Sequence, residues 1–252
     1  MTEDNTSKND GYGIFGNLSK TYDEIRPSIP PQIVDYIFTN VDLENPKILD
    51  VGCGTGIVTR QLSTWGKVTG ADKDARMIEQ AMQRNEGNIV YNVAPTENLP
   101  FDESTFDLVT AFSAFHWFAN EQAISEVRRV LKKGGVFFIA NRNQTGDIRK
   151  EYLETLKTFT NEKLPNIKKD FQPAQLLRKG QFRTILERKF PSMERLSLGE
   201  TLRYVQSTSL WNLVPKGKKQ EAMLALKSFF KERTQGGLVH RPVEIHTIMA
   251  QK

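Results

Sequence analysis

Cysteine and long apolar runs are the two scarcest features of this sequence. Cys53 is the single cysteine among 252 residues, so no intramolecular disulfide can form and a reducing compartment is expected. No stretch of about 18 apolar residues occurs, so we expect no membrane span. The first ten residues are polar and contain no apolar signal core. From these absences we expect a cytoplasmic protein.

Metal-ligand patterns are missing as well. The sequence has three histidines, His116, His240 and His246, and neither these nor the single cysteine show the spacing of a metal site. We therefore predict no metal cofactor. His240 and His246 lie in the last apolar segment of the chain, where a structural role is expected.

The small net charge of +5 conceals an asymmetry between the two parts of the chain. Residues 1–140 carry 13 basic and 19 acidic side chains, whereas residues 141–252 carry 22 basic and 11 acidic ones. The basic part is typical of solvated helices, or it attracts an anionic substrate or RNA. No RNA-binding module or zinc ribbon is visible, so nucleic acid is the less favoured partner.

Short apolar segments alternate with helical patterns between residues 47 and 140. Short apolar strands joined by helices predict a parallel sheet that is covered on both faces. The predicted fold class is therefore α/β, with a doubly wound, mostly parallel sheet. The expected strands are at 48–51, 67–72, 88–93, 106–110 and 136–140.

A glycine-rich turn, with Gly52, Gly54 and Gly56, follows the first predicted strand. It is not followed by the Gly-Lys-Ser/Thr of a phosphate-binding loop, and it is one residue shorter than the Gly-x-Gly-x-x-Gly dinucleotide pattern. Asp72 ends the next strand, where a carboxylate commonly binds ribose hydroxyls. NAD and S-adenosylmethionine (SAM) both carry a ribose, and SAM needs no pyrophosphate turn, so the short turn favours SAM.

Several blocks of sequence, in their order along the chain, resemble the class I SAM-dependent methyltransferases. The resemblance covers about residues 20–140 and implies a Rossmann-like fold. Two segments, YDEIRPSIP and FHWF, are similar to a small-molecule branch of trans-aconitate methyltransferase-like enzymes. The resemblance thus implies methyl transfer from SAM to a small molecule, and we expect a monomer or homodimer. The blocks are LDVGCGTG at 49–56, Asp72 with the residues after it, VAPTENLPF at 93–101, FDLVTAFSAFHWF at 106–118 and VRRVLKKGGVFFIA at 127–140.

The pattern of polar, helical and strand-like segments also predicts a division of the chain. Residues 16–141 would form the SAM-binding core, after a disordered segment at 1–15. The helical parts of 142–182 and 199–234 would form a lid over the carboxyl edge of the sheet. The terminal strands of the core sheet are expected at 183–198 and 238–250.

The cofactor contacts implied by the resemblance lie along the strand ends. The glycines of the turn would follow the methionine and ribose portions of SAM, and Asp50 would bond its amino group through backbone or water. Arg26 would clamp the carboxylate of SAM or pair with a nearby acid. Cys53 is either a nucleophile or a small side chain packed beneath the turn. The other predicted contacts are Tyr22, Asp72 at the ribose, Lys73 beside the adenine, Thr96 and Glu97 at the adenine rim, and Ser113 beside the sulfonium.

His116 and Trp117 follow the fourth strand, where the transferred methyl group is expected. His116 would act as a general base or line the pocket, since its ordinary pKa suits proton transfer. Trp117 would shape the pocket or face the sulfonium. The further substrate-pocket candidates are Phe15, Arg142, Arg203 and Trp211. RNA methylation and SAM binding without catalysis remain as alternatives, and the short glycine spacing disfavours an NAD-dependent oxidoreductase.

Overall fold

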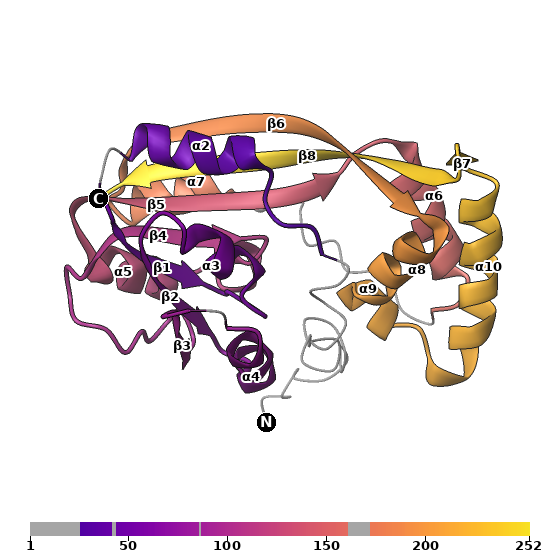
Figure 1. The fold of residues 1–252 in the computed structure, drawn as a ribbon, viewed down its shortest axis with the longest axis horizontal. Coiled ribbons are helices and arrows are strands. Elements are labelled where there is room, and N and C mark those ends of the chain that lie inside the picture. The colour runs from indigo at the N-terminus through magenta and orange to yellow at the C-terminus, as the bar shows by residue number, and fades with distance from the viewer. Residues whose placement is uncertain (1–25, 42–43, 86, 161–171) are drawn as a thin grey trace, which may run out of the picture.

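The computed structural model describes residues 26–41, 44–85, 87–160 and 172–252. These residues form one eight-stranded sheet with the order β3-β2-β1-β4-β5-β8-β6, and β7 pairs with β8 (Figure 1). The first five strands are parallel, and β8 runs antiparallel to both β5 and β6. The strands are β1 (Lys47–Val51), β2 (Lys67–Asp72), β3 (Val90–Val93), β4 (Phe106–Phe112), β5 (Leu131–Gln144), β6 (Arg183–Ser197), β7 (Thr234–Gln235) and β8 (Leu238–Gln251).

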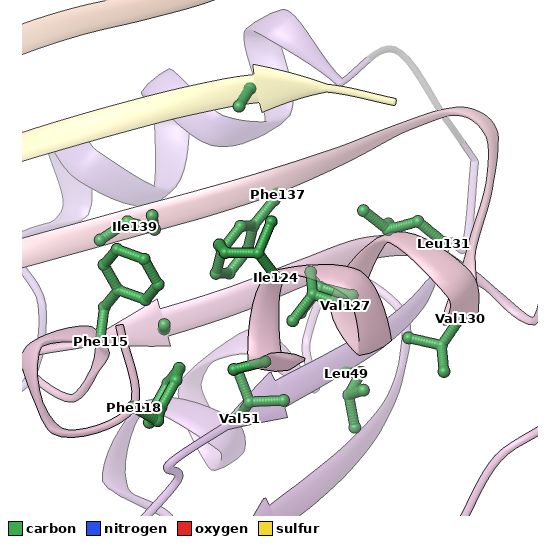
Figure 2. Packing of buried hydrophobic residues seen from close by; sticks show 14 of the residues in the cluster. Leu49, Val51, Phe115, Phe118, Ile124, Val127, Val130, Leu131, Phe137 and Ile139 are labelled. Atoms are coloured by element: carbon green, nitrogen blue, oxygen red, sulfur yellow. The ribbon is translucent and has the colours of Figure 1, made fainter. Parts of the chain in front are cut away.

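Helices cover both faces of the parallel part of the sheet. Successive strand residues point to opposite sides, so both faces carry apolar side chains that the helices bury. Leu49 and Phe137 face α5 and α7, whereas Ile48 and Phe138 face α2 and α3. Figure 2 shows the α5 face, with the apolar side chains of the helix turned toward the strands. None of the described helices is long and apolar enough to cross a membrane. The helices of this core are α2 (Pro31–Asn40), α3 (Ile57–Leu62), α4 (Ala75–Gln83), α5 (Glu121–Val130) and α7 (Pro173–Lys179).

A second group of helices lies at the far end of β5, β6 and β8, which run on beyond the parallel core (Figure 1). We call these helices the helical subdomain. They share a separate apolar cluster that includes Tyr152, Leu226 and Phe230. The subdomain consists of α6 (Asp147–Lys157), α8 (Leu198–Gln206), α9 (Ser209–Asn212) and α10 (Lys219–Lys231).

The structure confirms the α/β class and the mostly parallel sheet, and it has β6 and β8 where the terminal strands were predicted. It corrects the predicted helical segment 142–182 in two places. Residues 142–144 belong to β5, which is much longer than the predicted 136–140. In addition, α7 packs on the core through Leu177, beside α5, because its apolar side matches that face of the sheet. The predicted segment 1–15 lies outside the described residues.

Candidate functional site

A cavity of about 1070 Å³ opens at the carboxyl ends of β1, β2, β4 and β5 and reaches the helical subdomain. This is the edge where open α/β sheets bind ligands, beside the point where the strand order reverses between β1 and β4. Single-ligand pockets commonly have volumes of about 300–1,000 Å³. The cavity is therefore large enough for two small molecules at once.

The glycine turn after β1 forms one wall of the cavity. Gly52 and Gly54 line it with φ of +66° and +56°, a region that side chains disfavour. A Cβ on Gly52 would lie 2.6 Å from the Cβ of Ala114, whereas a Cβ on Gly54 would meet nothing within 4 Å. The space beside Gly54 thus lies open for a ligand against bare backbone. Gly56 does not line the described cavity wall. A Cβ on Gly56 would collide with the Tyr91 hydroxyl, so the absence of a side chain there leaves room for Tyr91.

Asp50 lies beneath this turn and is almost fully buried. Its Oδ2 accepts a hydrogen bond from Thr59 Oγ1 at 2.7 Å, and its Oδ1 accepts one from Thr110 Oγ1 at 2.9 Å. Burial raises the pKa of Asp50 from 3.8 to about 6, against the opposing effect of the two hydroxyl groups. A cationic ligand group nearby would favour the charged form.

Asp72 ties the end of β2 to the glycine turn. Its Oδ2 accepts from the Gly54 backbone N–H and its Oδ1 accepts from the Asp74 backbone N–H, both at 2.9 Å. Burial raises the pKa of Asp72, and the two backbone donors counteract that effect. A carboxylate has about four lone-pair sites, so two remain for ligand hydroxyls.

His116 and Trp117 form a short turn after β4 and line the cavity, and their neighbours Ala114 and Phe118 lie against Gly52. Their ring centroids lie 4.7 Å apart, and the buried Phe115 beside them anchors the turn in the core. Cys53 also lines the cavity, but it is half-buried against the Tyr91 cluster, and burial raises the pKa of its thiol. A thiol of this kind is a poor nucleophile, which favours the packing interpretation of Cys53.

The opposite end of the cavity is basic. Arg26 Nη1 donates to Tyr204 Oη and its Nη2 donates to the Ser207 carbonyl oxygen, both at 3.1 Å, so Arg26 joins the core to α8. Burial acts to raise the pKa of Tyr204, but the charges of Arg26 and Arg241 outweigh it and hold the pKa below its ordinary value. Local sequence gave no signal for Tyr204, because it lies on an ordinary amphipathic helix.

A buried ion-pair network supports this basic end. Arg142 Nη1 contacts Glu194 Oε1 at 2.6 Å, and Arg241 Nη1 contacts Glu194 Oε2 at 3.1 Å. Only 2% of the Arg241 side chain is exposed, and its guanidinium lies 3.6 Å from the ring centroid of Tyr204. One carboxylate therefore neutralises parts of two cations beside the cavity.

The structure brings most of the predicted site residues together around the cavity, whereas Gly56, Arg203 and Trp211 do not line it. Arg203 is exposed on α8, and Trp211 is buried in the core of the helical subdomain. Neither side chain lines the cavity, because that of Arg203 faces solvent and that of Trp211 faces the subdomain core. Phe15 and Tyr22 lie outside the described residues. Those that line the cavity are Arg26, Asp50, Gly52, Cys53, Gly54, Asp72, Lys73, Thr96, Glu97, Ser113, His116, Trp117 and Arg142.

Comparisons with known proteins agree on one kind of domain. Residues 49–139 match the family model described as a methyltransferase domain. An uncharacterized methyltransferase of Schizosaccharomyces pombe is 25% identical over 226 residues, which are 86% of this chain and 89% of the relative. Other curated relatives match about half of this chain, which spans between 26% and 57% of their lengths.

Solved structures of similar fold cover nearly the whole chain. A putative type II methyltransferase from Anaeromyxobacter dehalogenans has a TM-score of 0.67 and 19% identity, over 90% of this chain and 97% of that chain. Phosphoethanolamine N-methyltransferase 2 of Haemonchus contortus was solved with phosphomonomethylethanolamine and S-adenosylhomocysteine (SAH). It has a TM-score of 0.55 and 17% identity, over 94% of this chain and 57% of that chain. At these identities the likeness establishes the fold.

Proposed function

We propose that this chain, a SAM-dependent methyltransferase with a class I fold, methylates a carboxylate or hydroxyl group of a small anionic molecule. The methyltransferase domain at residues 49–139 and the similar methyltransferases support the reaction. One observation carries the choice of acceptor. The cavity that contains the glycine turn ends in a wall lined by three arginines, Arg26, Arg142 and Arg149.

SAM is the cofactor, and the residues at the strand ends fit it. When bound, it supplies a methyl group on a positively charged sulfur. We expect Asp72 to accept from the ribose hydroxyls, Asp50 to act on the amino group through backbone or water, and Gly54 to leave room beside the backbone. The remaining proposed contacts are Lys73, Thr96 and Glu97 around the adenine, and Ser113 near the sulfur.

The contribution of the protein to the reaction is chiefly alignment and exclusion of water. Alignment of reacting groups lowers a barrier by about 7–11 kcal/mol in favourable cases. His116 would take the proton of a hydroxyl acceptor, whereas an ionised carboxylate needs no base and leaves His116 a lining role. Trp117 would present its ring face to positive charge. We propose that the helical subdomain acts as a lid over the acceptor.

The finer assignment rests on two sequence blocks, one before the matched domain and one within it. We propose that the chain belongs to a small-molecule branch similar to trans-aconitate methyltransferase-like enzymes, and that it acts in the cytoplasm as a monomer or homodimer. The segment YDEIRPSIP at 22–30 supports the branch, together with FHWF at 115–118, of which the last three residues line the cavity.

Transfer of radiolabel from methyl-labelled SAM tests this proposal. The acceptor panel pairs small carboxylic acids and hydroxy acids with their neutral amides, and includes unmodified tRNA as a separate arm. We expect label in the acids and none in the amides or tRNA. Labelled tRNA would favour RNA methylation, and SAH binding without transfer to any acceptor would favour a non-catalytic SAM-binding protein. Either result contradicts the proposal.

A further inference from the structure

We propose that Arg149, in the first turn of α6, binds the anionic group of the acceptor and thereby determines which acceptors the cavity admits. This inference rests on the proposed function, since it assumes that the basic end of the cavity holds the acceptor. Arg149 is half-buried and lines the cavity from the helical subdomain.

The other two arginines of this wall are engaged by the protein itself. Arg142 is paired with Glu194 and also donates to the Ser28 carbonyl oxygen at 2.8 Å. Arg26 donates to Tyr204 and Ser207. Their guanidinium groups are therefore held in place and in part satisfied, as expected of residues that shape a wall.

Arg149 is different, because the acids near it on α6 pair with other cations. Asp147 contacts Lys150 at 3.2 Å, and Glu151 contacts Arg233 at 2.9 Å. Arg149 itself makes no hydrogen bond or ion pair with any part of the chain that the structure describes. A cation in the first turn of a helix also gains nothing from the helix dipole, which favours anions there. The helix end and the guanidinium would together attract an anion.

Two amide side chains of β5 that line the cavity also contain a buried polar atom without a partner. Asn141 Oδ1 and Gln144 Nε2 are buried and form no hydrogen bond with described residues, although both side chains belong to the cavity lining. Gln144 is held by its other end, because its Oε1 accepts from Arg241 at 3.2 Å. Gln144 lies on the same face of β5 as Arg142, and Asn141 on the other face, because successive strand residues point to opposite sides. Buried polar atoms left without partners are costly, so a hydrogen-bond acceptor on the bound molecule would satisfy Gln144 Nε2.

The chemistry of this wall selects a class of ligand. A guanidinium binds carboxylate or phosphate oxygens through two parallel hydrogen bonds, which an ammonium cannot reproduce. The Gln144 amide would donate to a polar group elsewhere on the same molecule. The predicted acceptor is thus a small carboxylate or phosphate compound with further hydrogen-bonding groups, and a neutral analogue would be rejected.

Thermal unfolding of the SAH complex tests the role of Arg149. The unfolding temperature is measured with added succinate, inorganic phosphate or neutral succinamide, for the unchanged chain and for Arg149→Gln. Lys150→Gln is the matched control, since it removes the same charge from the neighbouring, exposed position on α6. Arg149→Lys is the second variant, should the glutamine variant fail to fold.

We expect succinate or phosphate to raise the unfolding temperature of the SAH complex, and succinamide to leave it unchanged. The rise should persist in Lys150→Gln, disappear in Arg149→Gln and be reduced in Arg149→Lys. The more effective anion identifies the carboxylate or the phosphate class. An equal rise in Arg149→Gln, or no rise from either anion in the unchanged chain, would overturn the inference. Failure of SAH itself to stabilise the unchanged chain would instead refute the proposed function.

Discussion

The two ends of the cavity are built in different ways. At the strand end, Asp72 accepts a hydrogen bond from Gly54, which is only 18 residues away. Asp72 is the last residue of β2, and Gly54 lies in the turn that follows β1. At the basic end, Arg26 reaches Tyr204 across 178 residues, and Arg142 reaches Glu194 across 52. The contacts at the strand end thus join residues that are close in sequence. The contacts at the basic end join distant residues, which meet only because β5, β6 and β8 position the helical subdomain beside the core. This difference suits a common cofactor at one end and a variable acceptor at the other.

The largest expected effect comes from a substitution that disrupts only the basic end of the cavity. Glu194→Gln leaves the buried Arg241 and the largely buried Arg142 without their carboxylate. Removal of one partner from a buried ion pair costs about 3–5 kcal/mol, so the free energy of unfolding should fall by that order in a urea titration. Glu187→Gln, which removes an exposed partner of His246, is the control and should cost about 1 kcal/mol or less. Similar losses in both variants would show that the network does not hold this end together.

The next effect breaks the strand end. Asp72→Ala removes the carboxylate that accepts from Gly54 and Asp74 and is proposed to bind the ribose. Because hydrogen bonds to charged groups contribute about 1.5–3 kcal/mol, SAH affinity should fall roughly tenfold to hundredfold in a calorimetric titration. Asp102→Ala removes an exposed acid outside the cavity and should bind SAH normally. Normal affinity in Asp72→Ala would remove this residue from the cofactor site.

A smaller effect concerns pH at the strand end. Burial raises the pKa of Asp50 in the folded chain to about 6, above its ordinary value of 3.8. The folded chain therefore retains this proton to a higher pH than the unfolded chain does. The stability that the neutral form contributes is lost as the pH rises from about 4 to 6. Binding of the SAH amino group favours the charged form. We therefore expect SAH affinity to rise by up to about tenfold between pH 5 and 7, and to vary less in Asp50→Asn. An identical pH profile in the two proteins would exclude Asp50 as the cause.

The smallest expected effect tests whether anion binding depends on Arg149 specifically or on any arginine of the helical subdomain. Arg203 is exposed on α8 and does not belong to the cavity wall, unlike Arg149 on α6. Arg203→Ala should therefore leave SAH affinity and the anion-dependent rise in unfolding temperature within about twofold, as is usual for exposed substitutions. If Arg203→Ala abolished the anion-dependent rise as completely as Arg149→Gln, the overall positive charge of the subdomain would attract the anion, and Arg149 would have no specific role.

The same contrast explains what the sequence could predict. Strand ends, the glycine turn and Asp72 were predictable, because strand period and turn chemistry act over short distances. Arg203 and Trp211 were predicted to line the pocket and do not line the described cavity, since a helical pattern reveals an apolar face but not what lies opposite it. Arg149 gave no local signal at all. Its exposure to the cavity depends on the length of β5, which runs to Gln144 instead of ending near residue 140.

The most direct test of the account is a calorimetric titration of the unchanged chain with SAH and, in parallel, with NADH. Arg149→Gln is titrated with SAH beside it. The account predicts binding of SAH, no binding of NADH and unchanged SAH affinity in the variant, because the cofactor occupies the strand end and the arginine serves the other end. No binding of SAH, or binding of NADH in its place, would contradict the assignment of the glycine turn to SAM.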